Sequence, residues 1–243
     1  MIRKLLSFVN RRRVLQGLVI LLCFATVAGG IGYTHNVSVP VSAKPEMRSE
    51  IIIDAGHGGV DSGALGLYGI VEKDINLSIS LKLADMLDTM GFKTTLVRGK
   101  DESIHDPDAN TIRKKKNTDL KNRLKLMNKN PSSITVSIHQ NIFEERKYSG
   151  AQMFYGTENP ESEMLAKGLQ DNFRKYLQPE NSRVIKKAGS NLYLMQNVLT
   201  PAVLCECGFL SNPEEAQKLA ESGYQDMVAF TIAVSLIEFI QTS

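Results

Sequence analysis

Short β-branched runs alternate with longer helical segments from residue 49 to the end of the chain, and this alternation constrains the fold more than any other feature. Residues 51–53 and 133–139 have the composition of buried strands, and segments of 10–20 residues with helical periodicity separate such runs. Strands joined through helices pair in parallel, and a parallel sheet needs cover on both faces. The pattern therefore predicts an α/β fold, a mostly parallel sheet with helices on both faces.

Local signals place the individual elements. We expect strands at residues 51–53, 93–98, 133–139, 151–155, 192–194 and 201–207. We expect helices at residues 73–90, 119–128, 161–176 and 224–240, and a shorter one that begins at residue 213. Thr118 is the expected N-cap of the second helix, and Gly91 is the expected stop of the first. Residues 99–117, which include the basic run 113–116, are expected to form a surface loop.

The first 33 residues have the composition of an export signal. Five basic residues and no acid occur among residues 1–13, and an almost uninterrupted apolar stretch follows at residues 14–33. We expect a signal peptide or membrane anchor at 1–33, a linker at 34–48 and one catalytic domain at 49–243. The sequence leaves open whether the leader is cleaved, because its apolar stretch is long enough to span a membrane. The protein is expected to be exported across the cytoplasmic membrane, and either secreted or anchored.

The distribution of charge argues against a nucleic-acid partner. The formal net charge is +3, from 29 basic and 26 acidic residues, but five of the basic residues belong to the leader. The remainder holds 24 basic against 26 acidic residues, so no basic footprint is left for nucleic acid. Three cysteines are too few for a disulfide framework. Cys205 and Cys207, two apart on an expected strand, should share a face as small buried residues.

Histidines and carboxylates gather where the expected strands end, which is the edge at which α/β sheets bind ligands. His57 follows the first strand in a loop with four glycines, His139 ends the strand at 133–139, and Glu206 lies near the end of the last strand. Glu72 stands just before the first helix. Two histidines and one carboxylate, with a fourth position left to water, suit catalytic Zn²⁺, and a second carboxylate can serve as general base.

Each of these residues taken alone is more often structural. A histidine at a strand end is commonly a hydrogen-bonded structural residue. A glutamate at a helix start commonly does no more than stabilise the helix through its interaction with the helix dipole. The glycine loop is not a phosphate-binding loop, because no Gly-Lys-Ser/Thr follows it. No Gly-x-Ser-x-Gly elbow supports a serine hydrolase. His35 and His105 fall in the expected linker and loop, and no functional role is predicted for them.

Four ordered motifs together carry a specific resemblance. They are Asp-Ala-Gly-His-Gly-Gly at 54–59, Glu-Lys-Asp-Ile-Asn at 72–76, Ser-Ile-His-Gln-Asn at 137–141 and Glu-Cys-Gly-Phe-Leu-Ser-Asn at 206–212. In order and spacing they resemble the N-acetylmuramoyl-L-alanine amidases of the third amidase family, over residues 49–241. The short chain with a lone catalytic domain is most similar to the sporulation-specific members of that family. Relatives often differ at Ile142 and at Met195-Gln196, near expected substrate contacts.

The resemblance implies a fold and a set of roles. It implies a roughly six-stranded sheet, Zn²⁺ bound by His57, Glu72 and His139, and Glu206 as the catalytic residue. Asn76 and Asn141, within the second and third motifs, become candidates for contacting the substrate or supporting the metal ligands. The implied partner is peptidoglycan. Whether an envelope protein also assists the activity is left open. Two other functions remain: a catalytically silent relative that binds wall or a partner, and a glycosidase that uses Glu72 with Glu206.

Overall fold

The computed structural model describes residues 50–242, and the expected leader and linker lie outside the described residues. Within 50–242, six strands form one sheet in the order β2-β1-β3-β6-β4-β5. The strands are β1 (Ile51–Ala55), β2 (Thr94–Leu96), β3 (Ile134–Asn141), β4 (Gln152–Tyr155), β5 (Lys186–Lys187) and β6 (Ala202–Phe209). All neighbours pair in parallel except β4 and β6, which are antiparallel. The predicted α/β class with a mostly parallel sheet is confirmed.

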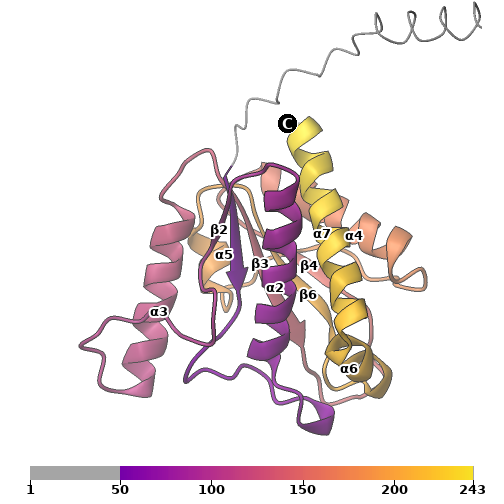
Figure 1. Ribbon diagram of the computed structural model, residues 1–243, viewed down its shortest axis with the longest axis horizontal. Coiled ribbons are helices and arrows are strands. Elements are labelled where there is room, and N and C mark those ends of the chain that lie inside the picture. The colour runs from indigo at the N-terminus through magenta and orange to yellow at the C-terminus, as the bar shows by residue number, and fades with distance from the viewer. Residues whose placement is uncertain (1–49, 243) are drawn as a thin grey trace, which may run out of the picture. The chain divides into compact units, whose positions relative to one another are not determined.

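Helices cover both faces of this sheet. They are η1 (Leu67–Gly69), α2 (Glu72–Thr89), α3 (Ile112–Met127), α4 (Glu161–Tyr176), α5 (Tyr193–Asn197), α6 (Pro213–Ala220) and α7 (Ser222–Thr242). Helices α2, α4, α6 and α7 pack on one face in the larger apolar cluster. Helices α3 and α5 supply the smaller cluster on the other face. In Figure 1, α2 and α7 lie in front of the sheet and α5 lies behind it.

Alternate residues of each strand supply the two clusters. Ile51 and Ile53 of β1 are fully buried in the larger cluster, whereas Ile52 between them packs in the smaller one. This alternation follows from the pleat, which points successive side chains to opposite faces. Cys205 and Cys207 both lie in the larger cluster, buried and not joined by a disulfide. The predicted shared face of the two cysteines is therefore confirmed.

Helix α7 is the one described helix that is long and apolar enough to cross a membrane, and half of its most apolar window is buried. Its side chains Val228, Ile232 and Leu236 have no exposed surface and pack in the larger cluster. Burial of one apolar face against other helices is the behaviour of a core helix.

Helix α3 corrects the predictions for residues 99–128. The helix begins at Ile112, so the prediction that residues 99–117 form a loop is wrong for the basic run 113–116. Thr111 is the N-cap, and its side chain accepts a hydrogen bond from the Lys114 amide, whereas Thr118 lies inside the helix. Among the side chains of α3 only Asp119, Arg123 and Met127 are buried. An apolar stripe was therefore lacking, and hydrophobic periodicity could not locate the helix start.

The strand expected at residues 192–194 is also wrong, because these residues begin helix α5. Leu194 and Met195 of α5 are buried in the smaller cluster. A five-residue helix is too short to show a period that distinguishes it from a strand. The missing strand is instead β5 at Lys186–Lys187, whose exposed lysines are typical of a protected sheet edge.

The position of the α3 cap can be tested. Thr111→Ala removes the acceptor for the Lys114 amide and should lower the free energy of unfolding by about 1 kcal/mol, whereas Thr111→Ser should retain most of it. Denaturant unfolding of the domain measures both variants. Equal stability of the alanine variant and the wild type would contradict the assigned helix start.

Candidate metal centre

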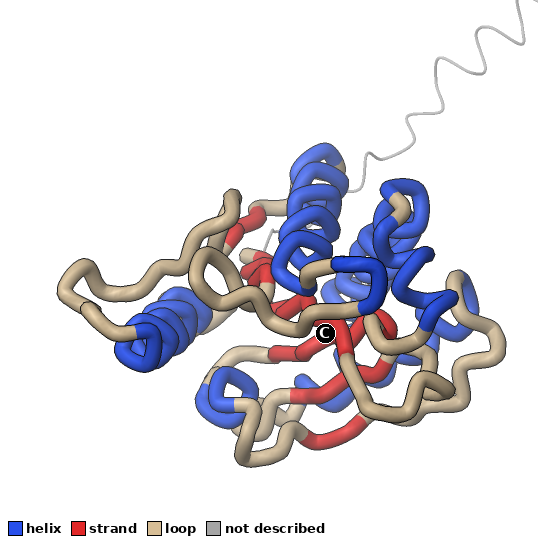
Figure 2. The backbone as a smooth tube through the Cα atoms, turned by 90° about the horizontal axis from the view of Figure 1, so that it is seen from below, coloured by secondary structure: helices blue, strands red, loops and turns tan. Residues whose placement is uncertain are grey.

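The fold brings the predicted site residues together at the carboxyl ends of the parallel strands, the end that faces the viewer in Figure 2. His57 lies in the loop after β1, His139 lies in β3, and Glu206 lies in the neighbouring strand β6. The register pairs His139 directly with Glu206. Glu72, the first residue of α2, completes the set from the layer above the sheet. A register shift just beyond His139 interrupts the β3–β6 ladder, an irregularity common beside active sites.

The two histidines converge on the carboxylate of Glu72. His57 Nε2 lies 3.3 Å from Glu72 Oε2, and His139 Nδ1 lies 3.0 Å from Glu72 Oε1. The imidazole rings stand edge to face with centroids 4.9 Å apart. One ligand atom from each of the three residues can be chosen so that all lie within 4.8 Å of one another.

This donor set fits a zinc ion. Imidazole nitrogens and carboxylate oxygens bind zinc at about 2.0–2.1 Å, so tetrahedral ligand atoms are separated by roughly 3.3 Å. The contacts from Glu72 to the two imidazoles are close to that separation. Three protein ligands leave a fourth coordination position free for water or substrate, as in catalytic zinc sites.

Two glycines leave the room that these side chains occupy. A Cβ on Gly56 would lie 2.3 Å from the imidazole of His139. A Cβ on Gly63 would lie 2.5 Å from Glu72 Oε2 and 2.6 Å from His57 Cδ2, and Gly63 also has a φ of +66° that disfavours side chains. The glycine loop therefore serves the packing of the candidate ligands.

Two buried arginines hold the backbone of the His57 loop. Arg98 donates to the carbonyls of Ala55 and Gly56 at 2.8 and 3.0 Å. Arg123, from α3, donates to the carbonyls of Ala55 and His57 at 2.9 and 2.6 Å. His57 has a φ of +62°, a left-handed conformation that costs a non-glycine residue free energy. The guanidinium of Arg123 on its carbonyl helps to maintain that conformation.

The charge of Arg123 is neutralised inside the protein. Its Nη1 lies 2.5 Å from Asp54 Oδ1 and its Nε lies 2.6 Å from Asp119 Oδ2. Asp54 also accepts a 2.6 Å hydrogen bond from the Ser137 hydroxyl. Burial alone would raise the pKa of Asp54, but Arg123 and Ser137 lower it below its usual value. This buried network ties the ends of β1 and β3 to α3.

A second contact from α3 reaches the other nitrogen of His57. His57 Nδ1 lies 3.0 Å from Asp61 Oδ2, and Asp61 Oδ1 lies 2.7 Å from Lys116 Nζ. A carboxylate on the distal nitrogen of a histidine fixes the orientation of its ring as a metal ligand. Burial opposes the charged imidazole, but hydrogen bonds to Asp61 and Glu72 raise the pKa of His57 to about 9.

Backbone amides and Asn76 hold the carboxylate of Glu72. Glu72 Oε2 accepts from the Ala64 amide at 2.8 Å, and Oε1 accepts from the Gln140 amide at 3.1 Å and from Asn76 at 3.2 Å. Burial alone would raise the pKa of Glu72, but the hydrogen bonds to His139 and His57 lower it well below its usual range. Asn76 thus supports a candidate ligand. Asn141 ends β3, and its role stays a prediction.

Glu206 has a different environment from Glu72. Its Oε2 is shielded from solvent and has no hydrogen-bond partner among the described residues. Burial raises the pKa of Glu206 to about 7, against the opposing charge of His139 and with a further contribution from Glu72. An unpaired carboxylate oxygen beside a candidate metal site is suited to exchange a proton with a bound molecule.

A cavity of about 190 Å³ opens over the two histidines. Lys116 and Leu120 of α3 and Leu194 of α5 form its wall opposite the sheet. Helix α3 therefore contributes both to the support of His57 and to the wall of the site.

Arg98, Arg123 and Asp61 were not among the site residues predicted from the sequence. Arg98 closes the expected strand 93–98, so its strand-end position was the same signal that selected His139. Asp119 and Arg123 are four apart on a helix, a spacing that also suits a solvated surface pair. Only their burial distinguishes the two interpretations.

Comparison with known proteins identifies the family that this chain resembles. The sequence model of a family described as N-acetylmuramoyl-L-alanine amidase matches residues 51–238. The germination-specific N-acetylmuramoyl-L-alanine amidase of Bacillus subtilis is 38% identical over 202 residues, which cover 83% of this chain and 82% of that protein. The family resemblance indicated by the four motifs is confirmed.

Solved structures agree with this comparison. The CwlD amidase from Clostridioides difficile, solved in complex with the GerS lipoprotein, has a TM-score of 0.76 and 38% identity, over 80% of this chain and 100% of that one. The catalytic domain of CwlV from Bacillus (Paenibacillus) polymyxa has a TM-score of 0.66 and 28% identity, over 80% of this chain and 99% of that one.

The packing of Gly56 against His139 predicts a loss of metal binding. Gly56→Ala should displace the imidazole and weaken zinc affinity by at least about tenfold, the size of effect seen when support of a ligand is lost. Gly99→Ala is the matched control, because a Cβ there meets nothing within 4 Å. Competition with a chromophoric chelator measures both. Equal zinc affinity of the two variants would show that His139 does not bind the metal.

The Asp54–Arg123 pair predicts a pH-dependent stability difference. Asp54→Asn should lower the free energy of unfolding by about 3–5 kcal/mol at pH 7, because Arg123 loses a buried partner. The folded-state pKa of Asp54 lies below its usual 3.8, so its ionised form stabilises the fold above about pH 4. That stability is lost as the pH falls through the lower folded value.

Denaturant unfolding from pH 7 to pH 3 should therefore show the gap between wild type and Asp54→Asn narrowing only below about pH 4. Asp85→Asn, an exposed acid on α2 with no ion pair among the described residues, is the control. A gap that stays constant down to pH 3 would contradict the depressed pKa of Asp54.

Proposed function

The chain belongs to the N-acetylmuramoyl-L-alanine amidase family and is a peptidoglycan amidase of that class, and we propose that it uses zinc to hydrolyse the amide between N-acetylmuramic acid and L-alanine. The observation that carries the zinc proposal is the convergence of His57, Glu72 and His139 within 4.8 Å. Glu206, in register with His139, stands beside them with an unpaired carboxylate oxygen.

His57, Glu72 and His139 would hold the metal. When bound, zinc supplies Lewis acidity towards the amide carbonyl and towards water. Asp61 fixes the ring of His57 through Nδ1, which leaves Nε2 directed at the site. The Gln140 and Ala64 amides hold Glu72, so the ligand geometry is preorganised by backbone groups.

Glu206 acts as the proton carrier. Its carboxylate takes a proton from the attacking water as the carbon–oxygen bond forms, and it delivers that proton to the alanine nitrogen as the carbon–nitrogen bond breaks. The products are the lactyl carboxylic acid of the glycan and a peptide with a free amino terminus. Burial, which raises the pKa of Glu206 to about 7 in the metal-free protein, favours a group that can both accept and return a proton.

The proposed setting is the developing spore. The germination-specific relative at 38% identity supports a role in cortex maturation, in which removal of the peptide prepares muramic acid for lactam formation, and hence in germination. The leader, which is basic and then apolar, supports export across the cytoplasmic membrane into the intermembrane space of the forespore, the site of the cortex.

We also propose that an envelope protein assists this activity. The support is the CwlD amidase from Clostridioides difficile, whose structure was solved with a lipoprotein bound.

The two competing functions have weaker support. A glycosidase needs Glu72 as one of its carboxylates, but backbone amides and two imidazoles already occupy the oxygens of Glu72. A catalytically silent relative that only binds the wall or a partner would not require an intact set of candidate metal ligands or an unpaired Glu206.

Two substitutions separate the metal from the proton transfer. Glu206→Gln removes the base and should reduce amide cleavage by at least about a hundredfold while zinc content stays at one per chain. His139→Ala should lose both zinc and activity. Metal content is measured by atomic emission and cleavage by release of new amino termini. Full activity of Glu206→Gln, or full zinc occupancy of His139→Ala, would overturn the assigned roles.

The bond itself is identified by mass spectrometry of muropeptides after incubation with residues 49–243. We expect peptide-free muramic acid and free L-alanine amino termini in the presence of zinc, and neither after treatment with a chelator. Chelator-resistant release of reducing sugar ends would instead support the glycosidase.

A further inference from the structure

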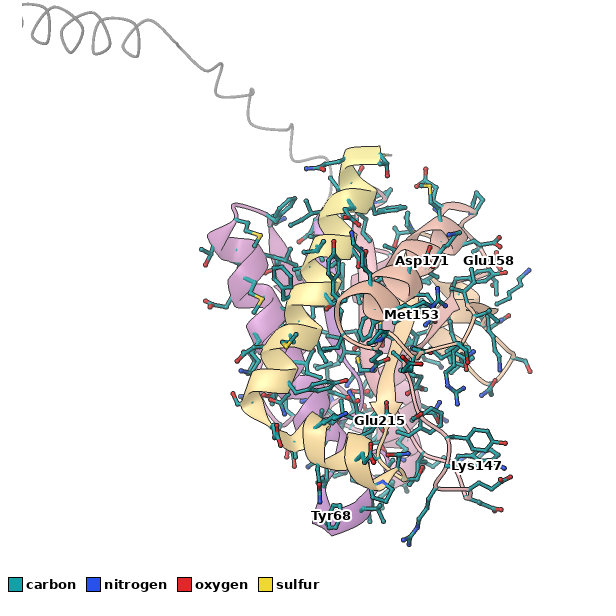
Figure 3. All side chains as sticks on the ribbon, turned by 90° about the vertical axis from the view of Figure 1, so that its right-hand side faces the viewer. Tyr68, Lys147, Met153, Glu158, Asp171 and Glu215 are labelled. Atoms are coloured by element: carbon teal, nitrogen blue, oxygen red, sulfur yellow. The ribbon has the colours of Figure 1, made fainter. Side chains whose placement is uncertain are left out.

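A cleft of about 760 Å³ lies beyond Glu206 on the side away from the metal ligands. Its walls come from residues 147–152 at the start of β4, residues 177–184 after α4, and the first turns of α6. In Figure 3 the labelled Lys147 and Glu215, which line it, lie at the same lower end of the domain as Tyr68. The reaction described above uses none of the residues that line this cleft.

A row of polar side chains joins the candidate metal centre to this cleft. His139 pairs in register with Glu206, and Glu206 pairs in register with Gln152 of β4. Residues directly opposite each other on neighbouring strands point to the same face of a sheet, so the three side chains share a face. Gln152 Oε1 accepts a 3.1 Å hydrogen bond from Arg183 Nη1. Arg183 is therefore the next group along the row, on the far side from the metal.

The guanidinium of Arg183 is fixed in place. Its Nε donates to the Ser149 carbonyl at 2.7 Å. Its central carbon lies 4.5 Å from the ring centroid of Phe209 and 5.9 Å from that of Tyr148. Aromatic rings and hydrogen bonds on several sides hold the cation in one orientation before any ligand binds.

Arg183 forms no ion pair within the described residues, although its charge opposes the rise in the pKa of Glu215 that burial causes. None of the described carboxylates lies within 4.0 Å of its guanidinium, and Nη2 makes no hydrogen bond there. Glu215, which lines the same cleft, already accepts hydrogen bonds from the Gly150 and Phe209 amides at 2.8 Å. An oriented guanidinium with a free edge is a recognition site for a carboxylate.

The chemistry of the substrate says which side of the scissile bond supplies that carboxylate. The only carboxyl group of N-acetylmuramic acid is consumed in the amide, so the glycan carries no negative charge near the bond. The peptide on the amine side carries free carboxylates. Gln152 lies one strand spacing, about 4.8 Å, from Glu206. The guanidinium lies one hydrogen bond of 3.1 Å beyond the Gln152 side chain, roughly 8 Å from Glu206 in all, and two extended residues span about 7 Å, so the second residue of the peptide can reach it.

We propose that this cleft binds the peptide side of the substrate, and that Arg183 is a specificity residue that pairs with the free carboxylate of the second amino acid. The proposal rests on the amidase function above and assigns its leaving-group side. The glycan then extends from the metal centre in the opposite direction, towards the wall formed by α3.

Two substrates test the proposal. Both are muramoyl peptides on a glycan of the same length, and the carboxylate of the second residue is free in one and a carboxamide in the other. We expect the zinc-loaded wild type to have a kcat/KM about ten- to a hundredfold higher for the acid than for the carboxamide. This ratio corresponds to the free energy of a hydrogen bond to a charged group. Arg183→Gln should bring that ratio close to one, and Arg183→Lys should restore part of it.

The ratio separates recognition from a structural effect. A merely structural role of Arg183 would lower kcat/KM for both substrates and leave their ratio unchanged, which would overturn the proposal. Lys187→Gln, which removes an exposed charge on β5 outside the cleft, should keep the wild-type ratio. A wild type that cleaves both substrates equally overturns the assignment of Arg183 alone. A wild type that cleaves neither overturns the proposed function itself.

Discussion

Two buried guanidinium groups bound to backbone carbonyls are the interaction on which the candidate site depends. Arg98 and Arg123 together bind the carbonyls of residues 55, 56 and 57, the turn by which β1 leaves the sheet. Burying two cations is costly, and Asp54 and Asp119 offset that cost for Arg123. The turn includes a left-handed His57, a conformation that persists only when its surroundings hold it. The direction of the first candidate ligand therefore depends on charges that lie outside the candidate ligand set.

One face of the sheet changes from apolar to polar side chains along the direction of the parallel strands. Near the start of the strands that face is apolar, with Ile52 and Leu204 in the smaller cluster. Towards the carboxyl ends of the parallel strands the same face carries Asp54, His139 and Glu206, because the two-residue period of a strand keeps them on one side. Gln152 joins them from the start of the antiparallel strand β4. The opposite face is apolar under α2, α4 and α7 as far as Gln140, whose side chain donates to Asn76 of α2 at 3.2 Å. One face thus serves as core at one end and as reaction surface at the other, with α3 and α5 covering only the core part and the edge of the site.

Two carboxylates of the site have opposite properties because their surroundings differ. Glu72 is held by amides and imidazoles, which lower its pKa and keep it ionised, as the proposed role of a metal ligand requires. Glu206 lacks such partners, and burial raises its pKa. Divergent pKa values of neighbouring acids are the usual way in which one site combines a permanent charge with a proton carrier. Arg183, in the same cross-sheet row, adds a fixed positive charge further from the metal.

The sequence by itself determined the α/β class and the family, and it selected His57, Glu72, His139 and Glu206 as a candidate set, because strand ends, glycine turns and ordered motifs are local signals. The tertiary structure alone decided what holds and extends that set. Arg123 meets the His57 carbonyl 66 residues away, and the start of α3 has no apolar period to mark it. Arg183 reaches Gln152 across 31 residues. A charged side chain looks the same in sequence whether it is solvated or buried, and only long-range packing, which removes water from around it, separates a surface charge from one that positions a site.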